Sequence, residues 1–271
     1  MLPGLQRFVE IYLERIDTLR VAGAARTFEF PFDAGNFSIS MPHASGHFYE
    51  GPALQRLYTL LTPGIQVVDV GANIGNHTVY FAGELGCRVL PFECNPNLIP
   101  KLRRAIESAG LGELVDMSRL GTSVSDVIGD VYFNFMRADY SSVAKTQSGA
   151  APAVPSVTLD SLELTSCRLL KVDVDGGELG VLRGAEQFLR KHLPILALEV
   201  MNSNTVEALS FMERVGYGQI REDRPLRTHS DFIFAPIDLT LPGIWCEVAQ
   251  AALSGPAPAW SSAPWRRCAE R

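Results

Sequence analysis

The chain has 271 residues, a formal net charge of −6 and 46% hydrophobic residues, which suits one α/β domain with additions at both ends. The acidic balance argues against a nucleic-acid backbone as the main partner, because phosphate binding needs a basic surface. Five widely spaced cysteines without a Cys-x-x-Cys pair indicate neither a disulfide framework nor a zinc ribbon, and no apolar run is long enough to span a bilayer, so we expect a cytoplasmic protein.

The first predicted element is an amphipathic helix in which apolar residues recur at helical spacing from Leu5 to Leu19. Short strands are expected at Phe28–Pro31 and Phe37–Met41, on either side of a turn. We therefore predict a separate N-terminal extension over residues 1–50. Its helix is a candidate contact between subunits of a homo-oligomer.

Strands and helices alternate from residue 51 to about residue 240, which predicts a mostly parallel, seven-stranded α/β sheet with helices on both faces. The remaining residues, 241–271, are rich in Pro, Ala and Ser, and we expect them to be partly disordered. The expected strands are the run from Val67, Arg88–Phe92, Leu114–Ser118, Arg168–Val174, Ile195–Val200, the pair Gln219–Arg221 and Phe232–Phe234, and an edge strand or hairpin at Val131–Phe135. The expected helices are Gly51–Leu61, Asn97–Ala109, Glu178–His192 and Thr205–Val215.

The most informative segment is an apolar β-branched run that ends in Asp69 and continues into a turn containing Gly71 and Gly75. A carboxylate in such a turn would repel a phosphate but would attract an amino group or a ribose hydroxyl. The segment therefore favours a nucleoside that carries a cation, and S-adenosylmethionine is the common ligand of that kind. The glycine spacing lacks the Gly-x-Gly-x-x-Gly pattern of NAD sites, and no ATP-binding P-loop motif is present.

A second acid, Glu93, follows the next strand about 20 residues after Gly71, close to the spacing of a ribose-binding acid in a strand–helix–strand unit. A carboxylate has acceptor capacity for both ribose hydroxyls. This combination of strand, acid, glycine turn, helix, strand and acid is far more specific than a pair of glycines alone.

A third cluster contains Asp173, Asp175 and Glu178, where another apolar strand ends and a helix begins. These acids have three interpretations: a helix cap, ligands of a divalent cation, or a base that accepts the proton of a substrate hydroxyl. Asp173 is the best candidate for a catalytic base, because an acid that ends a buried strand costs burial free energy without structural return. Glu199, at the end of another strand, is the second candidate.

Three histidines, His43, His47 and His229, are weaker candidates for the base, because a lone histidine is more often a surface or core residue. We assign no metal site, because three acids without a further ligand do not define one.

These motifs resemble those of the FkbM family of S-adenosylmethionine-dependent methyltransferases. The chain departs from the family at one point: the family usually has Glu-Gly-Ala where this sequence has Asp175-Gly176-Gly177. The matching segments are Val67–Thr78, Phe92-Glu93 with Asn95-Pro96, Ser125-Asp126, Val157–Leu162, Lys171–Glu178, Leu182–Ala185 and Glu199.

The resemblance implies a Rossmann-like class I methyltransferase fold and O-methylation of a hydroxyl on a sugar, glycoconjugate or polyketide-type small molecule. It implies that Glu93 binds the ribose, with Asn95 beside it, that Ser125 and Asp126 lie near the adenine, and that Glu50 closes over the cofactor. Asp175 and Glu178 would contact the substrate. The residues expected around the methionyl part are Asp69, Gly71, Asn73, Gly75 and Asn76.

Two alternatives remain beside this interpretation. N-methylation of nucleic acid commonly uses an Asn-Pro-Pro-aromatic segment where this chain has Asp175-Gly176-Gly177, and the net charge disagrees with it. An inactive module that serves as a binding or assembly subunit is the other alternative. The two acids Asp69 and Glu93 argue against it, because a scaffold would not need both.

Overall fold

The computed structural model describes residues 17–33, 35–51, 54, 61–133, 153–223 and 228–237. Most of the expected N-terminal helix and the whole 241–271 tail lie outside these residues, as does most of the expected Gly51–Leu61 helix. None of the helices in the described part of the chain is long and apolar enough to cross a membrane.

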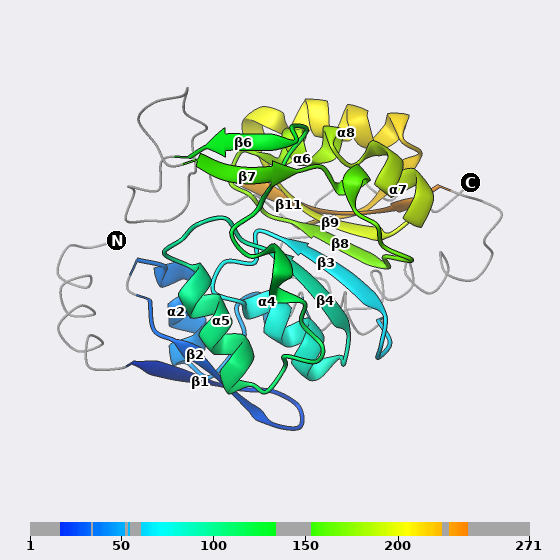
Figure 1. The fold of residues 1–271 in the computed structure, drawn as a ribbon. Helices are drawn as coiled ribbons and strands as arrows, with labels where there is room; N and C mark the ends of the chain where they lie inside the picture. The colour runs from blue at the N-terminus through cyan, green and yellow to red at the C-terminus, as the bar shows by residue number, and fades with distance from the viewer. Residues whose placement is uncertain are drawn as a thin grey trace, which may run out of the picture.

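The main sheet has six strands in the order β10-β11-β9-β8-β3-β4 (Figure 1). Strands β4, β3, β8 and β9 are parallel, whereas β11 runs antiparallel to both of its neighbours. This arrangement confirms the predicted Rossmann-like α/β class with a mostly parallel sheet. The strands are β3 (Gln66–Val70), β4 (Arg88–Phe92), β8 (Leu169–Val172), β9 (Ile195–Met201), β10 (Tyr217–Asp223) and β11 (His229–Pro236).

The seventh expected strand, Leu114–Ser118, is not formed in the described residues. Only one parallel bridge, between Val115 and Val89, remains in its place. The chain then enters a short 3-10 helix, Met117–Arg119. At the start of this helix, Ser118 N donates a hydrogen bond to the Asp116 carboxylate. This local cap competes with strand pairing and ends the pairing after one residue.

The two faces of the sheet are covered by different elements, as Figure 1 shows. One face packs against α6 (Glu178–Arg183), α7 (Glu186–His192) and α8 (Thr205–Arg214) in a continuous apolar cluster. The other face packs against α4 (Asn76–Val79), a π-helical turn (Tyr80–Glu84), α5 (Ile99–Ser108) and the N-terminal extension. We call this second side the extension face.

The single helix expected at Glu178–His192 is divided into α6 and α7 at Gly184 and Ala185. A Cβ atom on Gly184 would overlap the Ser125 carbonyl oxygen. The close approach of another loop therefore requires glycine at this position, and glycine weakens a helix.

The N-terminal extension contains a hairpin of β1 (Thr18–Ala22) and β2 (Thr27–Pro31), followed by α2 (Phe37–Ala44). Leu19 lies in β1, so the expected helix does not reach it. The strand predicted at Phe37–Met41 is wrong, because this segment is the start of α2. Burial follows helical spacing at Ile39, Ser40 and His43, and the Ser40 hydroxyl bonds the backbone N–H and C=O of Asp33.

A smaller sheet of three strands, β5 (Ser123–Val124), β7 (Ala153–Val157) and β6 (Gly129–Tyr132), lies beside α6. The edge strand expected at Val131–Phe135 corresponds to β6, which pairs antiparallel with β7. This sheet positions the loop that contains Ser125 and Asp126.

Candidate active site

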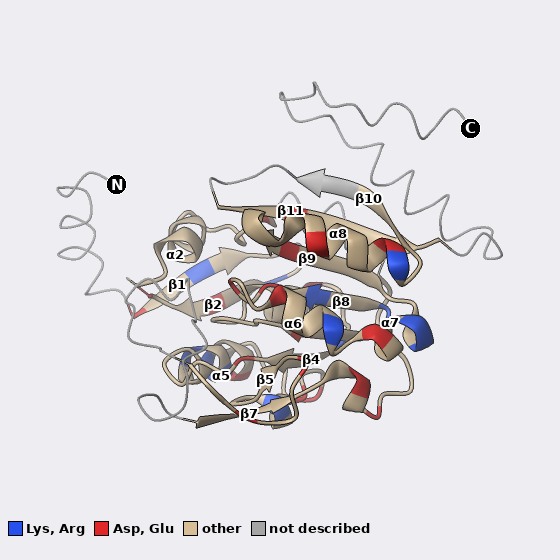
Figure 2. Cartoon of the chain, turned by 90° about the horizontal axis from the view of Figure 1, so that it is seen from above, with Lys and Arg blue, Asp and Glu red and all other residues tan. Residues whose placement is uncertain are grey.

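A row of charged side chains lies at the carboxyl end of the sheet, on the extension face. The register aligns Asp69 of β3 with Lys171 of β8, and Glu199 of β9 with Asp231 of β11. Asp173 follows Lys171 by two positions and therefore points to the same face. Figure 2 shows an acidic segment, in red, on β9. The strand ends thus bring four acids and a lysine together.

Lys171 is the cation of this row. Its side chain is 8% exposed, and its Nζ lies 3.0 Å from Asp173 Oδ2 and 3.9 Å from Asp69 Oδ1. Burial alone would lower the pKa of Lys171, but the charges of Asp173 and Asp69 raise it above its ordinary value. Sequence reasoning gave Lys171 no role, although a lysine inside an otherwise apolar buried strand is a recognisable signal.

Asp69 is completely buried (0% exposed). Its Oδ2 accepts a hydrogen bond of 2.6 Å from Thr78 Oγ1, and its Oδ1 faces Lys171. Oδ2 is therefore bonded to a protein group, whereas the buried Oδ1 has no hydrogen-bond partner among the described residues and faces the Lys171 ammonium. The expected contact of Asp69 with a cofactor stays a prediction.

The glycine turn after β3 is held against the neighbouring strands. The N–H groups of Gly71 and Ala72 both donate to the Phe92 carbonyl oxygen, at 2.9 and 3.0 Å. Gly71 has a φ of +86°, and a Cβ on it would overlap the Asp173 carbonyl oxygen. Gly75 also has a positive φ, and Asn73 adopts the left-handed region at +53°. The turn therefore brings β3 and the Asp173 tip into direct contact.

Glu93 lies just after β4 and is 8% exposed. Its two carboxylate oxygens accept backbone hydrogen bonds of 2.8 Å from Asn73 N and Asn95 N. Burial, followed by the charges of Asp69 and Asp173, raises the pKa of Glu93 to about 7, although the two N–H bonds oppose this shift. The glycine turn and Glu93 are therefore brought together as expected. The Asn95 side chain itself bonds Asn97 N.

Asn76 begins α4 and is 2% exposed. Its Oδ1 accepts hydrogen bonds from Tyr49 N and from the ring of His43, each at 2.9 Å, and its Nδ2 donates to Tyr49 O at 3.1 Å. These bonds hold the carboxamide against the extension, and the expected contact of Asn76 with a cofactor stays a prediction. Burial lowers the pKa of His43 to about 4, so its ring is neutral, and His47 is exposed.

Tyr49 and Glu50 extend from this contact towards the charged row. Glu50 has a φ of +56°, and its Oε2 lies 3.1 Å from His77 Nε2. Burial alone would raise the pKa of Glu50, but the hydrogen bond from His77 and nearby positive charges lower it. Burial and the charges of Glu50 and Asp173, together with other acids of the row, raise the pKa of the Tyr49 phenol. The extension therefore lies beside the charged row, and closure of Glu50 over a cofactor stays a prediction.

Asp173, Asp175 and Glu199 form the second half of the site, with carboxylate oxygens within 4.8 Å of one another. Burial and the charge of Asp173 raise the pKa of Asp175 to about 7. Burial and the charges of Asp173 and Asp231 raise the pKa of Glu199 to about 9. His229 approaches Glu199 at 3.6 Å. Such crowded carboxyl groups share protons, and the ammonium of Lys171 is already in contact with one of them.

Glu178 does not join this group as an available ligand. It is 1% exposed, and its Oε1 accepts hydrogen bonds from Met201 N at 2.6 Å and from Asn204 Nδ2 at 3.1 Å. Glu178 therefore links the start of α6 to the end of β9. This position agrees with the helix-start interpretation, and the expected substrate contact of Glu178 stays a prediction.

Gly121, just before β5, donates its N–H to Glu93 O at 2.8 Å, and Ser125 and Asp126 follow directly after β5. The Ser125 hydroxyl lies 2.9 Å from Ser156 Oγ and accepts a bond from Val127 N. Asp126 pairs with Arg183 at 2.8 Å. The loop is next to the expected ribose site, although both side chains are bonded to other protein groups.

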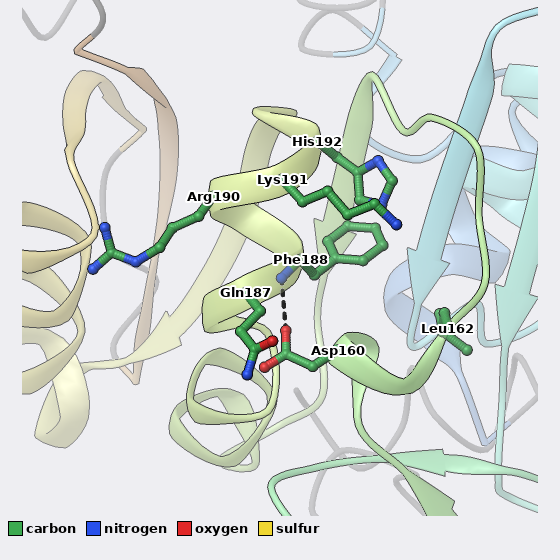
Figure 3. Close-up of a pocket in the computed structure, with 7 residues that line it drawn as sticks. All are labelled: Asp160, Leu162, Gln187, Phe188, Arg190, Lys191 and His192. Carbon is green, nitrogen blue, oxygen red and sulfur yellow. Dashed lines mark hydrogen bonds between the residues drawn. The ribbon is translucent and has the colours of Figure 1, made fainter.

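A separate cavity of 480 Å³ lies at the amino end of β8 and β9, the opposite edge of the sheet (Figure 3). Asp160 accepts a hydrogen bond from Phe188 N, and Figure 3 shows the Arg190 side chain pointing away from the other lining residues. None of the expected site residues lines it. The lining residues are Asp160, Leu162, Gln187, Phe188, Arg190, Lys191 and His192.

Comparison with known proteins gives one family and several solved structures. A model described as "Methyltransferase FkbM domain" matches residues 69–218, more than half of the chain. No curated protein matches.

Three solved structures illustrate the likeness. Methyltransferase FkbM from Methylobacillus flagellatus KT is 16% identical, with 79% of this chain and 56% of that chain covered and a TM-score of 0.46. Precorrin-6y C5,15-methyltransferase from Geobacter metallireducens GS-15 is 15% identical (69% and 86% covered, TM-score 0.44). An rRNA methylase from Streptococcus thermophilus is 14% identical (69% and 96% covered, TM-score 0.47).

Proposed function

Because the chain belongs to the FkbM family of S-adenosylmethionine-dependent methyltransferases, we propose that it methylates a hydroxyl group of a sugar, glycoconjugate or polyketide-type small molecule. The observation that carries this proposal is the position of Asp173. Its carbonyl packs against Gly71 of the glycine turn, and its carboxylate is held by Lys171 at 3.0 Å. A carboxylate fixed beside a cofactor turn is suited to accept the proton of a hydroxyl.

The charge of the site supports S-adenosylmethionine as the cofactor. Burial and mutual repulsion raise the pKa values of Glu93, Asp175 and Glu199, which indicates excess negative charge. A ligand that carries a sulfonium and an ammonium would relieve this repulsion, whereas a pyrophosphate would increase it. Glu93 would bind the ribose hydroxyls, and the turn from Gly71 to Gly75 would hold the methionyl part. When bound, the cofactor would supply a methyl group bonded to a positively charged sulfur.

The residues around Asp173 would hold the acceptor for an in-line transfer. This chain would contribute by positioning the acceptor oxygen and removing its proton. The hydroxyl proton would pass to the Asp173 carboxylate. Glu199, which titrates at a higher pH than an ordinary carboxyl, would donate a hydrogen bond to the acceptor.

A neutral hydroxyl acceptor also fits the row better than nucleic acid does. Asp173, Asp175, Glu199 and Asp231 would all repel a phosphodiester backbone. The direct test is transfer of a labelled methyl group to a panel of sugars, polyketide alcohols, amines and RNA. Label in a hydroxyl acceptor supports the proposal. Label confined to amines or RNA would replace it, and no label with any acceptor would favour an inactive binding module.

We predict that Asp173→Asn lowers kcat by about 10²–10⁴-fold, the contribution of a positioned base, while S-adenosylhomocysteine binds nearly as well as before. Asparagine keeps the shape of the side chain but cannot accept the proton. The measurements are steady-state kinetics and calorimetric binding. The matched control is Asp130→Asn, which replaces an exposed acid of β6. It should leave kcat and the affinity for S-adenosylhomocysteine unchanged. Full activity in Asp173→Asn would remove this residue from the mechanism.

A further inference from the structure

Lys171 is a charged residue in a strand that is otherwise apolar and completely buried. Burial of an ammonium group is unfavourable unless opposite charges and hydrogen bonds compensate for the lost water. A strand residue that served packing alone would be apolar, like its neighbours Leu170 and Val172. The lysine therefore needs an explanation in terms of its partners.

The two partners of Lys171 differ in their surroundings. Asp69 is completely buried and is fixed by the hydrogen bond from Thr78 Oγ1. The side chain of Asp173 is 32% exposed and accepts a hydrogen bond of 3.0 Å from Lys171 Nζ. Lys171 therefore connects a rigid anion inside the protein to an accessible anion at the strand tip, and the parallel register of β3 and β8 sets this geometry.

Asp173 lies in a group of three carboxyl side chains. Three carboxyl groups with oxygens within 4.8 Å compete for protons, as acid pairs do in other sites. Lys171 contacts Asp173 alone among these three in the described ion pairs. Its charge therefore distinguishes Asp173 from the other two.

We propose that Lys171 is a positioning residue, which orients the Asp173 carboxylate and holds a positive charge beside it, so that Asp173 and not Glu199 takes the acceptor proton. This inference rests on the proposed function. The raised pKa of Glu199 agrees with it, because burial and neighbouring anions leave Glu199 as the group that holds a proton near neutral pH.

Charged and titratable groups surround Asp173 from several elements. Tyr49 and Glu50 approach from the extension, and His77 and His229 contact Glu50 and Glu199 respectively. The groups on the strand ends and the turns that follow them are Asp69, Glu93, Lys171, Asp175, Glu199 and Asp231.

Lys171→Met and Lys171→Arg test the proposal through the pH profile of kcat. Methionine has a similar length but no charge, so Asp173 loses its cationic partner. We expect Lys171→Met to lower kcat about 100-fold at neutral pH and to move the acid side of the profile upward by about one pH unit. Affinity for S-adenosylhomocysteine should change little. Lys171→Arg keeps the charge and should recover part of kcat with the profile of the wild type.

Several results would overturn the proposal. One is a Lys171→Met variant with unchanged kcat. Another is a Lys171→Met variant whose kcat and S-adenosylhomocysteine affinity fall together at every pH, because this pattern indicates a structural role. If Lys171→Met does not fold, Lys171→Arg decides: an unmoved profile with normal cofactor affinity supports the proposal, and parallel loss of affinity and kcat contradicts it. Failure of the proposed function would be distinct, because the wild type itself would then transfer no methyl group to a hydroxyl.

Discussion

Glu93 is fixed by backbone N–H groups and not by a side-chain cation. Asn73 N and Asn95 N hold its oxygens at 2.8 Å before any ligand binds. Burial and the charges of Asp69 and Asp173 raise its pKa to about 7, which places its titration near neutral pH. Ribose hydroxyls donate hydrogen bonds, and an ionised carboxylate accepts them best. Cofactor binding through Glu93 would therefore depend on pH in a range where an ordinary glutamate stays ionised.

We predict that the affinity for S-adenosylhomocysteine falls about tenfold between about pH 8 and about pH 6. The sign follows from the raised pKa: Glu93 is mostly ionised above about 7, and it takes up a proton as the pH falls through this value. Protonation removes acceptor capacity and weakens binding. Isothermal titration calorimetry at several pH values measures the effect. In Glu93→Gln the dependence should be lost, and an unchanged dependence in that variant would assign the titration to another group.

Single residues also show where sequence reasoning ends. The positions of Asp173 and Glu199 at strand ends could be predicted, and the structure brings them together. Asp69, Glu178 and Asn76 were expected at ligands, yet each is bonded to protein groups from other elements. Those partners depend on tertiary packing, which the spacing of motifs along one chain does not contain.

At the scale of elements, one buried side chain of the main domain bonds two segments of the N-terminal extension. Asn76 of α4 bonds both the N–H and the C=O of Tyr49, and it also bonds His43 of α2. The apolar side of the same contact is a small cluster of Ile39, Ile74 and Leu98, against which Tyr49 packs. This contact sets where Tyr49 and Glu50 lie over the charged row.

We predict that Asn76→Ala lowers the free energy of unfolding by about 1–3 kcal/mol, because buried backbone groups of Tyr49 lose their partners. Release of Tyr49 and Glu50 should also weaken S-adenosylhomocysteine binding several-fold. Denaturant unfolding and calorimetry measure the two effects. Asn76→Asp keeps an acceptor for Tyr49 N but loses the donor to Tyr49 O and buries a negative charge against that carbonyl, so it should destabilise the protein at least as much as Asn76→Ala. Loss of stability with unchanged binding would show that the extension does not cover the cofactor site.

The elements that could be predicted are those whose apolar pattern fits only one kind of secondary structure. The buried parallel strands β3, β4, β8 and β9 read as continuous apolar runs and were found. Phe37–Met41 has an apolar alternation that is typical of a strand. In the structure this segment is helical: Ser40 bonds the backbone of Asp33, and the buried residues, among them His43, follow helical spacing. The division of Glu178–His192 depends on contact between Gly184 and Ser125, which are far apart in the sequence.

At the scale of the whole molecule, the sheet has one apolar face and one face that changes character along its strands. The face under α6, α7 and α8 is apolar throughout. The extension face is apolar at the amino ends of the strands and becomes charged at their carboxyl ends, from Asp69 to Asp231. Parallel α/β sheets bind ligands at this edge, so the α/β class and the edge follow from the sequence. The cross-strand register, which pairs Asp69 with Lys171, does not.

The most direct measurement is calorimetric titration of the folded protein with S-adenosylhomocysteine, in the wild type, in Glu93→Gln and in the exposed control Glu163→Gln. We predict saturable binding in the micromolar range, weakened about 10–100-fold in Glu93→Gln by loss of a charged hydrogen bond and unchanged in Glu163→Gln. A folded wild type that does not bind, or a Glu93→Gln variant that binds as tightly as the wild type, would contradict the placement of the cofactor at the ends of β3 and β4.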